Sequence, residues 1–287
     1  MENRKQKFIN EAKTHLKRLS EIERTLDGES TKRHIYVYSP PGIGKSHFLT
    51  QLLEGKNIPH FKINGAISLA SFGIGLAVLR YQNQNKEKIL VVVDDCESLF
   101  GDNDFANTVK NVLEGKNRSY QYNKIQKGWN KGLTDEQRES IEFHSNPKTG
   151  GFEVPTDQFV FIFLSNTKLP TDKDIKAMKS GKPRDLANHR RAIRSRCKTI
   201  DLDLNRELLW GWIAYMTETY DIVENRLAGF ADSGKIIAEI LNWLFSNRNS
   251  TIEFSLRTVQ KMAESYVINT EHYEASWEQE FLDQKAA

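Results

Sequence analysis

One stretch of the chain, residues 33–51, constrains the fold more than any other part of the sequence. It begins with a β-branched and aromatic run around Ile35 and Val37, which favours a short buried strand. A turn follows, Ser39-Pro40-Pro41-Gly42-Ile43-Gly44-Lys45-Ser46, and an apolar helix is expected from His47 to Leu53. A strand, a glycine-containing loop ending in Gly-Lys-Ser and a helix, in this order, are the context of a phosphate-binding P-loop.

The residue types in this loop suit phosphate groups. Gly42 and Gly44 allow the backbone to curl so that successive N–H groups point inward, and the helix N-terminus adds the positive end of its dipole. Lys45 would reach the β- and γ-phosphates, and the Ser46 hydroxyl would coordinate Mg²⁺. We therefore expect ATP and Mg²⁺ as cofactors. The expected nucleotide contacts are Pro41, Gly42, Ile43, Gly44, Lys45, Ser46 and His47.

Position 39 departs from the usual pattern, which has glycine where this chain has Ser39. Serine tolerates most turn conformations, so we interpret the loop as a variant. A Gly-Lys-Ser tripeptide also occurs by chance in unrelated loops. The preceding strand and the following helix are what favour the P-loop interpretation.

Two further apolar runs predict buried strands with polar residues at their ends. Residues 88–95, KILVVVDD, predict a parallel strand that delivers Asp94 and Asp95 to the sheet edge where ligands bind in α/β proteins. Asp94 would hold Mg²⁺, and either Asp95 or Glu97 would polarise an attacking water. A strand that merely ends in an acidic turn is the alternative.

The other run, residues 158–165, ends at Asn166. Its amide is well placed to orient a water at a γ-phosphate, although an asparagine that simply starts a turn would look the same.

The composition favours a globular protein in a reducing compartment. The chain has 287 residues, 38% hydrophobic and 28% charged, which argues against disorder. Its two cysteines, Cys96 and Cys197, suggest no disulfide framework. The charged N-terminus does not resemble a secretory signal, and the most apolar run, residues 66–79, is too short to span a bilayer. We expect a cytoplasmic protein without a membrane partner.

Basic residues gather in two windows. Residues 110–131 include Lys124 and Lys127 with Tyr120, Tyr122 and Trp129 interleaved, the combination that single-stranded nucleic acid requires. A solvated loop whose aromatic residues pack inward is the alternative. Residues 173–198 form the more basic window, which is either a solvated helix face or an electrostatic footprint for nucleic acid.

The expected fold class is α/β, a P-loop-type parallel five-stranded sheet with a C-terminal helical lid. We expect an N-terminal amphipathic helix within residues 1–32, a nucleotide-binding domain at 33–204, and a helical domain at 205–287. Residues 116–158 would form a basic insertion with a hairpin around Phe152 to Val154.

Alternating strands and helices followed by a helical lid resemble the AAA+ ATPases over residues 33–277. SPPGIGKS is similar to the Walker A loop of that family, and VVVDDCE is similar to its Walker B strand. FIFLSN supplies the sensor 1 position, Asn166. AIRSRC resembles the Ser-Arg-Cys arginine-finger motif of clamp-loader ATPases.

The resemblance implies roles for several further residues. Arg196 would project into a neighbouring subunit's nucleotide and stabilise transition-state charge in trans, with Arg194 as the second candidate. Phe254 to Arg257 resembles the sensor 2 helix, so Arg257 would close the lid on the γ-phosphate. Phe72 lies roughly where hexameric motors carry a pore-loop aromatic residue.

Two features depart from most of the family. Asp95 stands where most members have glutamate, and the resulting Asp-Asp pair resembles that of replication-initiator branches. Residues 116–158 look like an insertion between the Walker B strand and sensor 1. The compact arrangement also resembles phage- or plasmid-encoded AAA+ proteins.

By this resemblance the chain would be an ATP hydrolase that forms a homo-oligomeric ring and couples ATP hydrolysis to remodelling or loading on DNA, with a replication protein as a partner. Two alternatives remain open. Phe72 would favour a protein-remodelling chaperone, and Asp95 would favour an ATP-binding scaffold with weak hydrolysis.

Overall fold

The computed structural model describes residues 2–95, 97–114, 119–122, 132–220, 222–223, 226–228, 230, 232–251 and 253–282. The chain divides into two compact units. The sheet unit comprises Ile22–Tyr38 and Leu49–Asp201, and the helical unit comprises Met1–Glu21, Ser39–Phe48 and Leu202–Ala287. Helices α1 (Glu2–Leu26) and α2 (Lys45–Gly55) contribute residues to both units.

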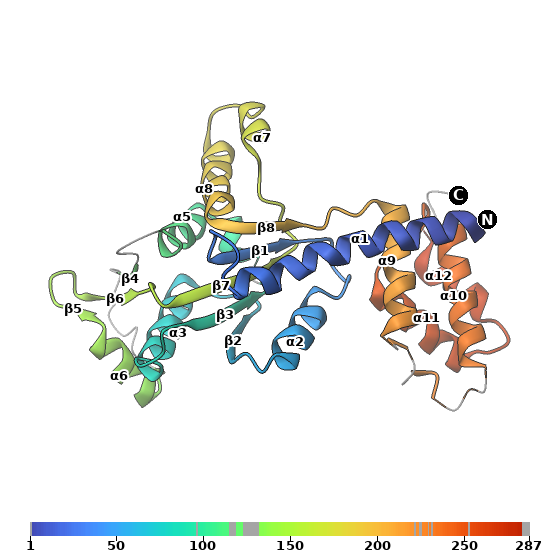
Figure 1. The fold of residues 1–287 in the computed structure, drawn as a ribbon, viewed down its shortest axis with the longest axis horizontal. Coiled ribbons are helices and arrows are strands. Elements are labelled where there is room, and N and C mark those ends of the chain that lie inside the picture. The colour runs from blue at the N-terminus through green and yellow to red at the C-terminus, as the bar shows by residue number, and fades with distance from the viewer. Residues whose placement is uncertain are drawn as a thin grey trace. The chain divides into compact units, whose positions relative to one another are not determined.

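The sheet unit contains a five-stranded sheet (Figure 1) in which each neighbouring pair of strands is parallel. The strands are β1 (His34–Tyr38), β2 (His60–Asn64), β3 (Ile89–Asp94), β7 (Phe159–Ser165) and β8 (Cys197–Asp201). Their spatial order is β2-β3-β7-β1-β8. The α/β class with a parallel five-stranded sheet is thereby confirmed.

Both faces of this sheet are covered, because every residue of β3 and β7 is buried. On one face, alternate strand residues such as Val91 and Phe161 join the core that α3, α5 and α8 complete. The helices of this unit are α3 (Leu69–Gln82), α4 (Ser98–Gly101), α5 (Asn103–Val112), α6 (Asp135–Phe143), α7 (Asp172–Lys176) and α8 (Lys182–Arg196). This burial explains why β3 and β7 are continuous apolar runs in the sequence.

A second, antiparallel sheet lies between β3 and β7 in the chain, in the order β4-β6-β5. Its strands are β4 (Ser119–Tyr122), β5 (Ser145–Asn146) and β6 (Gly151–Pro155). The pairing of β5 with β6 confirms the hairpin that the turn residues predicted. The small sheet packs on α3, as Figure 1 shows.

The helices of the helical unit are α9 (Arg206–Thr219), α10 (Ser233–Asn247), α11 (Leu256–Ile268) and α12 (Tyr273–Phe281), together with α1 up to Glu21 (Figure 1). Phe8 of α1 packs on Phe245 of α10, with ring centroids 6.4 Å apart. The backbone of α1 also approaches α9 closely, since a Cβ atom at Gly211 would lie 2.3 Å from the carbonyl oxygen of Phe8.

Among the described residues, no helix has the length and apolar character needed to cross a membrane. The C-terminal segment of the helical unit begins at Leu202, close to the boundary expected at residue 205. The same unit also takes in residues 39–48, which the sequence had placed with the sheet.

Candidate functional site

The carboxyl edge of the parallel sheet gathers three chain segments. β1, β3 and β7 end at Tyr38, Asp94 and Ser165, and β7 lies between the other two. The register places Asp94 beside Leu164 and Tyr38 beside Ser165, so the three ends are level. Ligands of α/β proteins bind at this edge. Within the sheet unit, the predicted acidic and amide residues therefore lie at the edge where β1 ends.

Asp94 is buried at the end of β3 and is paired with a cation. Its Oδ2 atom lies 3.0 Å from the Nζ atom of Lys62, which comes from the neighbouring edge strand β2. Asp94 is 4% exposed, whereas Lys62 is partly open to solvent. A buried carboxylate oxygen of Asp94 is thus held beside an ammonium at the end of β3, and carboxylate oxygens are the ligands that hard divalent cations prefer.

Asp95, the next residue, is exposed and has a φ of 53°, in the left-handed region. Aspartate tolerates this conformation better than most residues do. The change of backbone direction turns Asp95 out of the strand path, so that two successive carboxylates occupy different environments, one buried and one open to solvent.

Glu97 has a different role, because its carboxylate joins the ends of two strands. The hydroxyl of Ser165 donates to its two oxygens at 3.1 and 3.0 Å. The backbone N–H of Asn166 donates at 2.6 Å, and the hydroxyl of Thr167 donates as well. Both oxygens of Glu97 are thus engaged in positioning the end of β7, which leaves Asp95 as the more accessible carboxylate.

Tyr36 of β1 also bonds to the segment that follows β7. Its hydroxyl donates to the carbonyl oxygen of Thr167 at 2.6 Å. Burial raises the pKa of Tyr36 well above its ordinary value, so the hydroxyl remains a donor at physiological pH. Asn166 itself is exposed at the strand end.

The loop of residues 39–46 belongs to the helical unit and curls at two glycines. Gly42 and Gly44 have φ values of 71° and 87°, which favour glycine. Ser39 is not among the described residues with positive φ, so serine replaces the usual glycine without backbone strain. Helix α2 starts at Lys45, and its first-turn N–H groups lie directly after the curled segment.

Two carbonyl groups of this loop accept hydrogen bonds from α9 and α11 of the same unit. The Gly42 carbonyl accepts from the backbone N–H of Leu256 at 2.9 Å, and the Ile43 carbonyl accepts from the indole Nε1–H of Trp212 at 2.9 Å. The Nζ atom of Lys45 donates to the carbonyl oxygens of Ser39 and Pro40 at 3.1 and 3.3 Å, which keeps the ammonium over the loop. The glycines, the ammonium, the Ser46 hydroxyl and the helix start together fit a nucleotide phosphate chain with its magnesium ion.

Trp212 and Leu256 were not predicted as site residues. The sequence carries only a weak signal for Trp212, a tryptophan on an apolar helix face whose N–H requires an acceptor when buried. Arg257, the predicted sensor 2 residue, follows Leu256 directly at the start of α11. It is exposed, and its guanidinium has no hydrogen bond or ion pair with the described part of the chain.

The predicted arginine-finger residues end α8, just before β8. Arg196 pairs with Glu114 at 2.5 Å and donates to the Ala192 carbonyl at 2.8 Å. Arg194 pairs with Asp201 at 2.8 Å. These residues border a pocket of about 570 Å³ lined by Pro170, Thr171, Asp172, Arg191, Ala192, Arg194, Ser195 and Arg196.

Two residues expected to contact a substrate are instead part of the core. Phe72 and Tyr120 are each 1% exposed and pack edge to face, with ring centroids 6.0 Å apart. The Tyr120 hydroxyl donates to the Leu69 carbonyl at 2.6 Å. We therefore correct the interpretation of Phe72 as a pore aromatic and of Tyr120 as a base-stacking residue, because neither ring presents a surface to a substrate.

The other substrate contacts predicted in that window divide into two groups. Tyr122 is half-buried against Phe152, with ring centroids 5.6 Å apart. Lys124, Lys127 and Trp129 lie outside the described residues.

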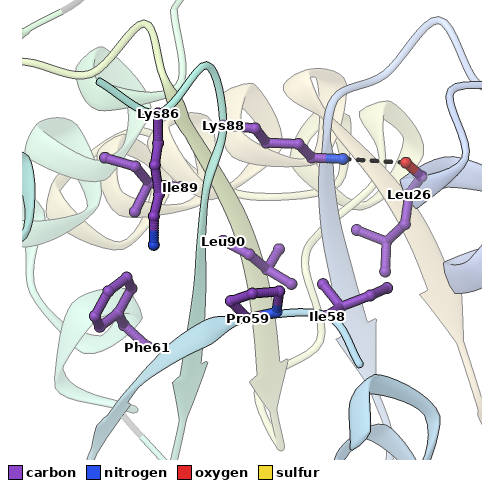
Figure 2. Close-up of a pocket in the computed structure, with 8 residues that line it drawn as sticks. All are labelled: Leu26, Ile58, Pro59, Phe61, Lys86, Lys88, Ile89 and Leu90. Atoms are coloured by element: carbon purple, nitrogen blue, oxygen red, sulfur yellow. Dashed lines mark hydrogen bonds between the residues drawn. The ribbon is translucent and has the colours of Figure 1, made fainter. Parts of the chain in front are cut away.

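A separate pocket lies at the opposite edge of the parallel sheet, at the starts of β2 and β3 (Figure 2). Its volume is about 280 Å³, and it is lined by Leu26, Ile58, Pro59, Phe61, Lys86, Lys88, Ile89 and Leu90. Lys88 donates to the Leu26 carbonyl at 3.0 Å, and burial lowers the pKa of its ammonium. Because it lies at the amino ends of the strands, this pocket is distinct from the candidate site.

Comparison of the chain with protein-family models and with curated proteins found no match in either case.

Proposed function

We propose that the protein is a magnesium-dependent ATPase of the AAA+ type. The observation that carries the proposal is the curled backbone of residues 39–46, with left-handed glycines at 42 and 44 immediately before the start of α2. Such a segment offers N–H groups and a helix dipole to phosphate oxygens. The two carboxylates and the amide at the ends of β3 and β7 supply the other groups that phosphoryl transfer requires.

Each residue has a proposed role. Lys45 would neutralise charge on the β- and γ-phosphates, and Ser46 and Asp94 would hold Mg²⁺, Asp94 through water. Bound Mg²⁺ would neutralise the charge that develops on the transferring phosphoryl group. Asp95 accepts a proton from the attacking water, and Asn166 orients that water. Arg257 contacts the γ-phosphate from α11.

The structure favours Asp95 over Glu97 as the base. A general base needs an open oxygen within reach of water, whereas the Glu97 oxygens accept hydrogen bonds from the end of β7. Asp95 is exposed and lies directly after the buried Asp94. Its shorter side chain also supports the second candidate, an ATP-binding scaffold with weak hydrolysis.

The proposed substrate of the motor is DNA. Support comes from α7 and the start of α8, where Lys173, Lys176, Lys179 and Lys182 are all exposed. Lysines on a surface bind the phosphate backbone independently of sequence. The burial of Phe72 removes the residue that favoured a protein-remodelling chaperone.

ATP turnover by wild type and by Lys45→Ala tests the proposal, with Lys235→Ala, an exposed position in the same unit, as the matched control. We expect turnover in wild type and in Lys235→Ala and none in a folded Lys45→Ala. Single-stranded DNA, duplex DNA and denatured protein are then added separately, and we expect stimulation by DNA. Equal turnover in wild type and Lys45→Ala would contradict the nucleotide site. Stimulation by denatured protein alone would contradict the DNA substrate, and intact ATP binding with negligible turnover in every arm would select the scaffold.

A further inference from the structure

Two adjacent carbonyl groups of the nucleotide loop are held by donors from two different helices. The Gly42 carbonyl accepts from the N–H of Leu256, the first residue of α11. The Ile43 carbonyl accepts from the indole of Trp212 in α9. Trp212 is 1% exposed and Ile43 is 1% exposed, so the second bond lies wholly inside the helical unit.

Because the peptide unit is planar, these two hydrogen bonds also fix the directions of the N–H groups that follow the bonded carbonyls. In a planar trans peptide, the C=O of one residue and the N–H of the next point in opposite directions. The donor from Leu256 therefore fixes the direction of the Ile43 N–H, and the donor from Trp212 fixes that of the Gly44 N–H. Both N–H groups are directed away from the helices that hold the carbonyls.

Side-chain packing reinforces the same orientation. A Cβ atom at Gly42 would lie 2.5 Å from the Cβ of Ser255, and one at Gly44 would lie 3.3 Å from Cδ1 of Leu256. The start of α11 therefore lies in contact with the loop backbone. A capping box between Ser255 and Thr258 holds that helix start in place.

We infer that Trp212 and the backbone N–H of Leu256 are positioning groups for phosphate binding, which set the direction of the loop N–H groups before the nucleotide arrives. The inference rests on the proposed function and extends it. The same bonds would also transmit a movement of the loop to α9 and α11. If a loop peptide rotates when a phosphate binds, its carbonyl moves, and the helix that donates to that carbonyl is displaced with it.

The chain provides a matched control for Trp212 two residues away. Trp210 is on the same helix, is 3% exposed, and donates its indole N–H to the Leu241 carbonyl at 3.0 Å. Replacing either tryptophan by phenylalanine removes one buried indole hydrogen bond from α9. Only the Trp212 bond reaches the loop, so the two variants share a stability effect and differ in the predicted effect on binding.

The first test measures binding of ADP with Mg²⁺ by calorimetry, which avoids turnover. We expect Trp212→Phe to bind about 3- to 10-fold more weakly than wild type, the fold-change that corresponds to the net value of one hydrogen bond. Trp210→Phe should bind as wild type does. The ADP-induced change in tryptophan fluorescence should be lost in Trp212→Phe and retained in Trp210→Phe.

The second test removes the backbone donor. Leu256→Pro places proline at the first position of α11, where the fixed φ suits a helix, and the preceding Ser255 has an extended φ of −154° and ψ of 172°. Leu256→Ala shortens the same side chain and keeps the N–H. We expect ADP affinity to fall further in Leu256→Pro than in Leu256→Ala.

The outcomes separate this inference from the proposed function. Failure of wild type to bind ADP would overturn both. Saturable binding by wild type, with equal affinities for Trp212→Phe and Trp210→Phe and an unaltered fluorescence response in both, would overturn the positioning role alone. Equal affinities for Leu256→Pro and Leu256→Ala would remove the role of the α11 donor.

Discussion

The backbone at position 42 has a φ of 71° and lies directly against Ser255. An alanine there would adopt an unfavourable left-handed conformation, which costs roughly 1–2 kcal/mol. It would also place a Cβ atom 2.5 Å from the Ser255 Cβ. These are separate physical effects, and the chain offers positions that distinguish them.

We predict that Gly42→Ala lowers the free energy of unfolding by more than Gly28→Ala does. Gly28 has a φ of 87°, and a Cβ atom there would meet nothing within 4 Å, so Gly28→Ala measures the backbone strain alone. Steric overlap at Gly42 should add about 1–3 kcal/mol. Urea denaturation measures both values, and the double variant Gly42→Ala/Ser255→Gly should recover part of the difference. Equal losses for the two alanine variants would show that α11 does not contact the loop.

The two candidate bases should also respond differently to removal of charge. Asp95→Asn preserves shape and tolerates the left-handed backbone, so we predict normal stability, retained ATP binding and loss of turnover. Glu97→Gln replaces one acceptor oxygen by an NH₂ group among three donors, so we predict a loss of about 1–3 kcal/mol in stability with only partial loss of turnover. Thermal unfolding and single-turnover assays of both variants test this. Normal turnover in Asp95→Asn, with none in a stable Glu97→Gln, would reverse the assignment.

At the scale of elements, the small sheet packs on α3 through the ring of Tyr120, which lies against Gly73 of that helix. A Cβ atom at Gly73 would lie 2.1 Å from Cε1 of Tyr120, and the Tyr120 hydroxyl bonds to the first residue of the same helix. Tyr120 also contacts Phe152 of β6, with ring centroids 6.1 Å apart. One side chain therefore links α3, β4 and β6.

We predict opposite effects of alanine at two glycines of α3. Gly73→Ala should destabilise the protein by about 1–3 kcal/mol, because the buried Tyr120 ring has to move. At Gly75 a Cβ atom would meet nothing within 4 Å, so Gly75→Ala should stabilise by up to about 1 kcal/mol through helix propensity. Chemical denaturation measures both. Stabilisation by both substitutions would show that Tyr120 does not pack on Gly73.

The strands were largely predictable from the sequence, and the long-range contacts were not. β3 and β7 were expected at residues 88–95 and 158–165, and they run from Ile89 to Asp94 and from Phe159 to Ser165, because a strand buried on both faces must be continuously apolar. The sequence left open whether Tyr120 stacks on bases or packs inward, because aromatic residues among lysines show the same pattern in a nucleic-acid surface as in a packed strand, and the structure shows that it is buried. The hydrogen bond from Trp212 to Ile43 joins residues 169 positions apart. Hydrophobic periodicity describes only neighbouring residues, so it could not predict this contact.

At the scale of the whole molecule, the position of Arg196 within the sheet unit bears on oligomerisation. Arg196 directly precedes β8, so it lies at the amino edge of the parallel sheet, level with the start of β1. Asp94 and Ser165 lie at the carboxyl edge. A strand of five residues at about 3.3 Å each separates the two edges by roughly 16 Å. Arg196 therefore cannot reach the acidic end of its own sheet, and a catalytic role requires a second subunit.

We predict that Arg196→Ala retains ATP binding and loses turnover by a factor on the order of 10³–10⁵, the usual effect of a trans arginine. Arg191→Ala is the control, because Arg191 lies on the same helix, lines the same pocket and is also paired with an acid, Asp172 at 2.8 Å. Mixing Arg196→Ala with Lys45→Ala should restore part of the turnover, since a shared interface can combine an intact Lys45 from one subunit with an intact Arg196 from the other. Light scattering with ATP reports whether subunits associate. A mixture as inactive as its parents, from protein that stays monomeric with ATP, would show that Arg196 serves only its ion pair with Glu114.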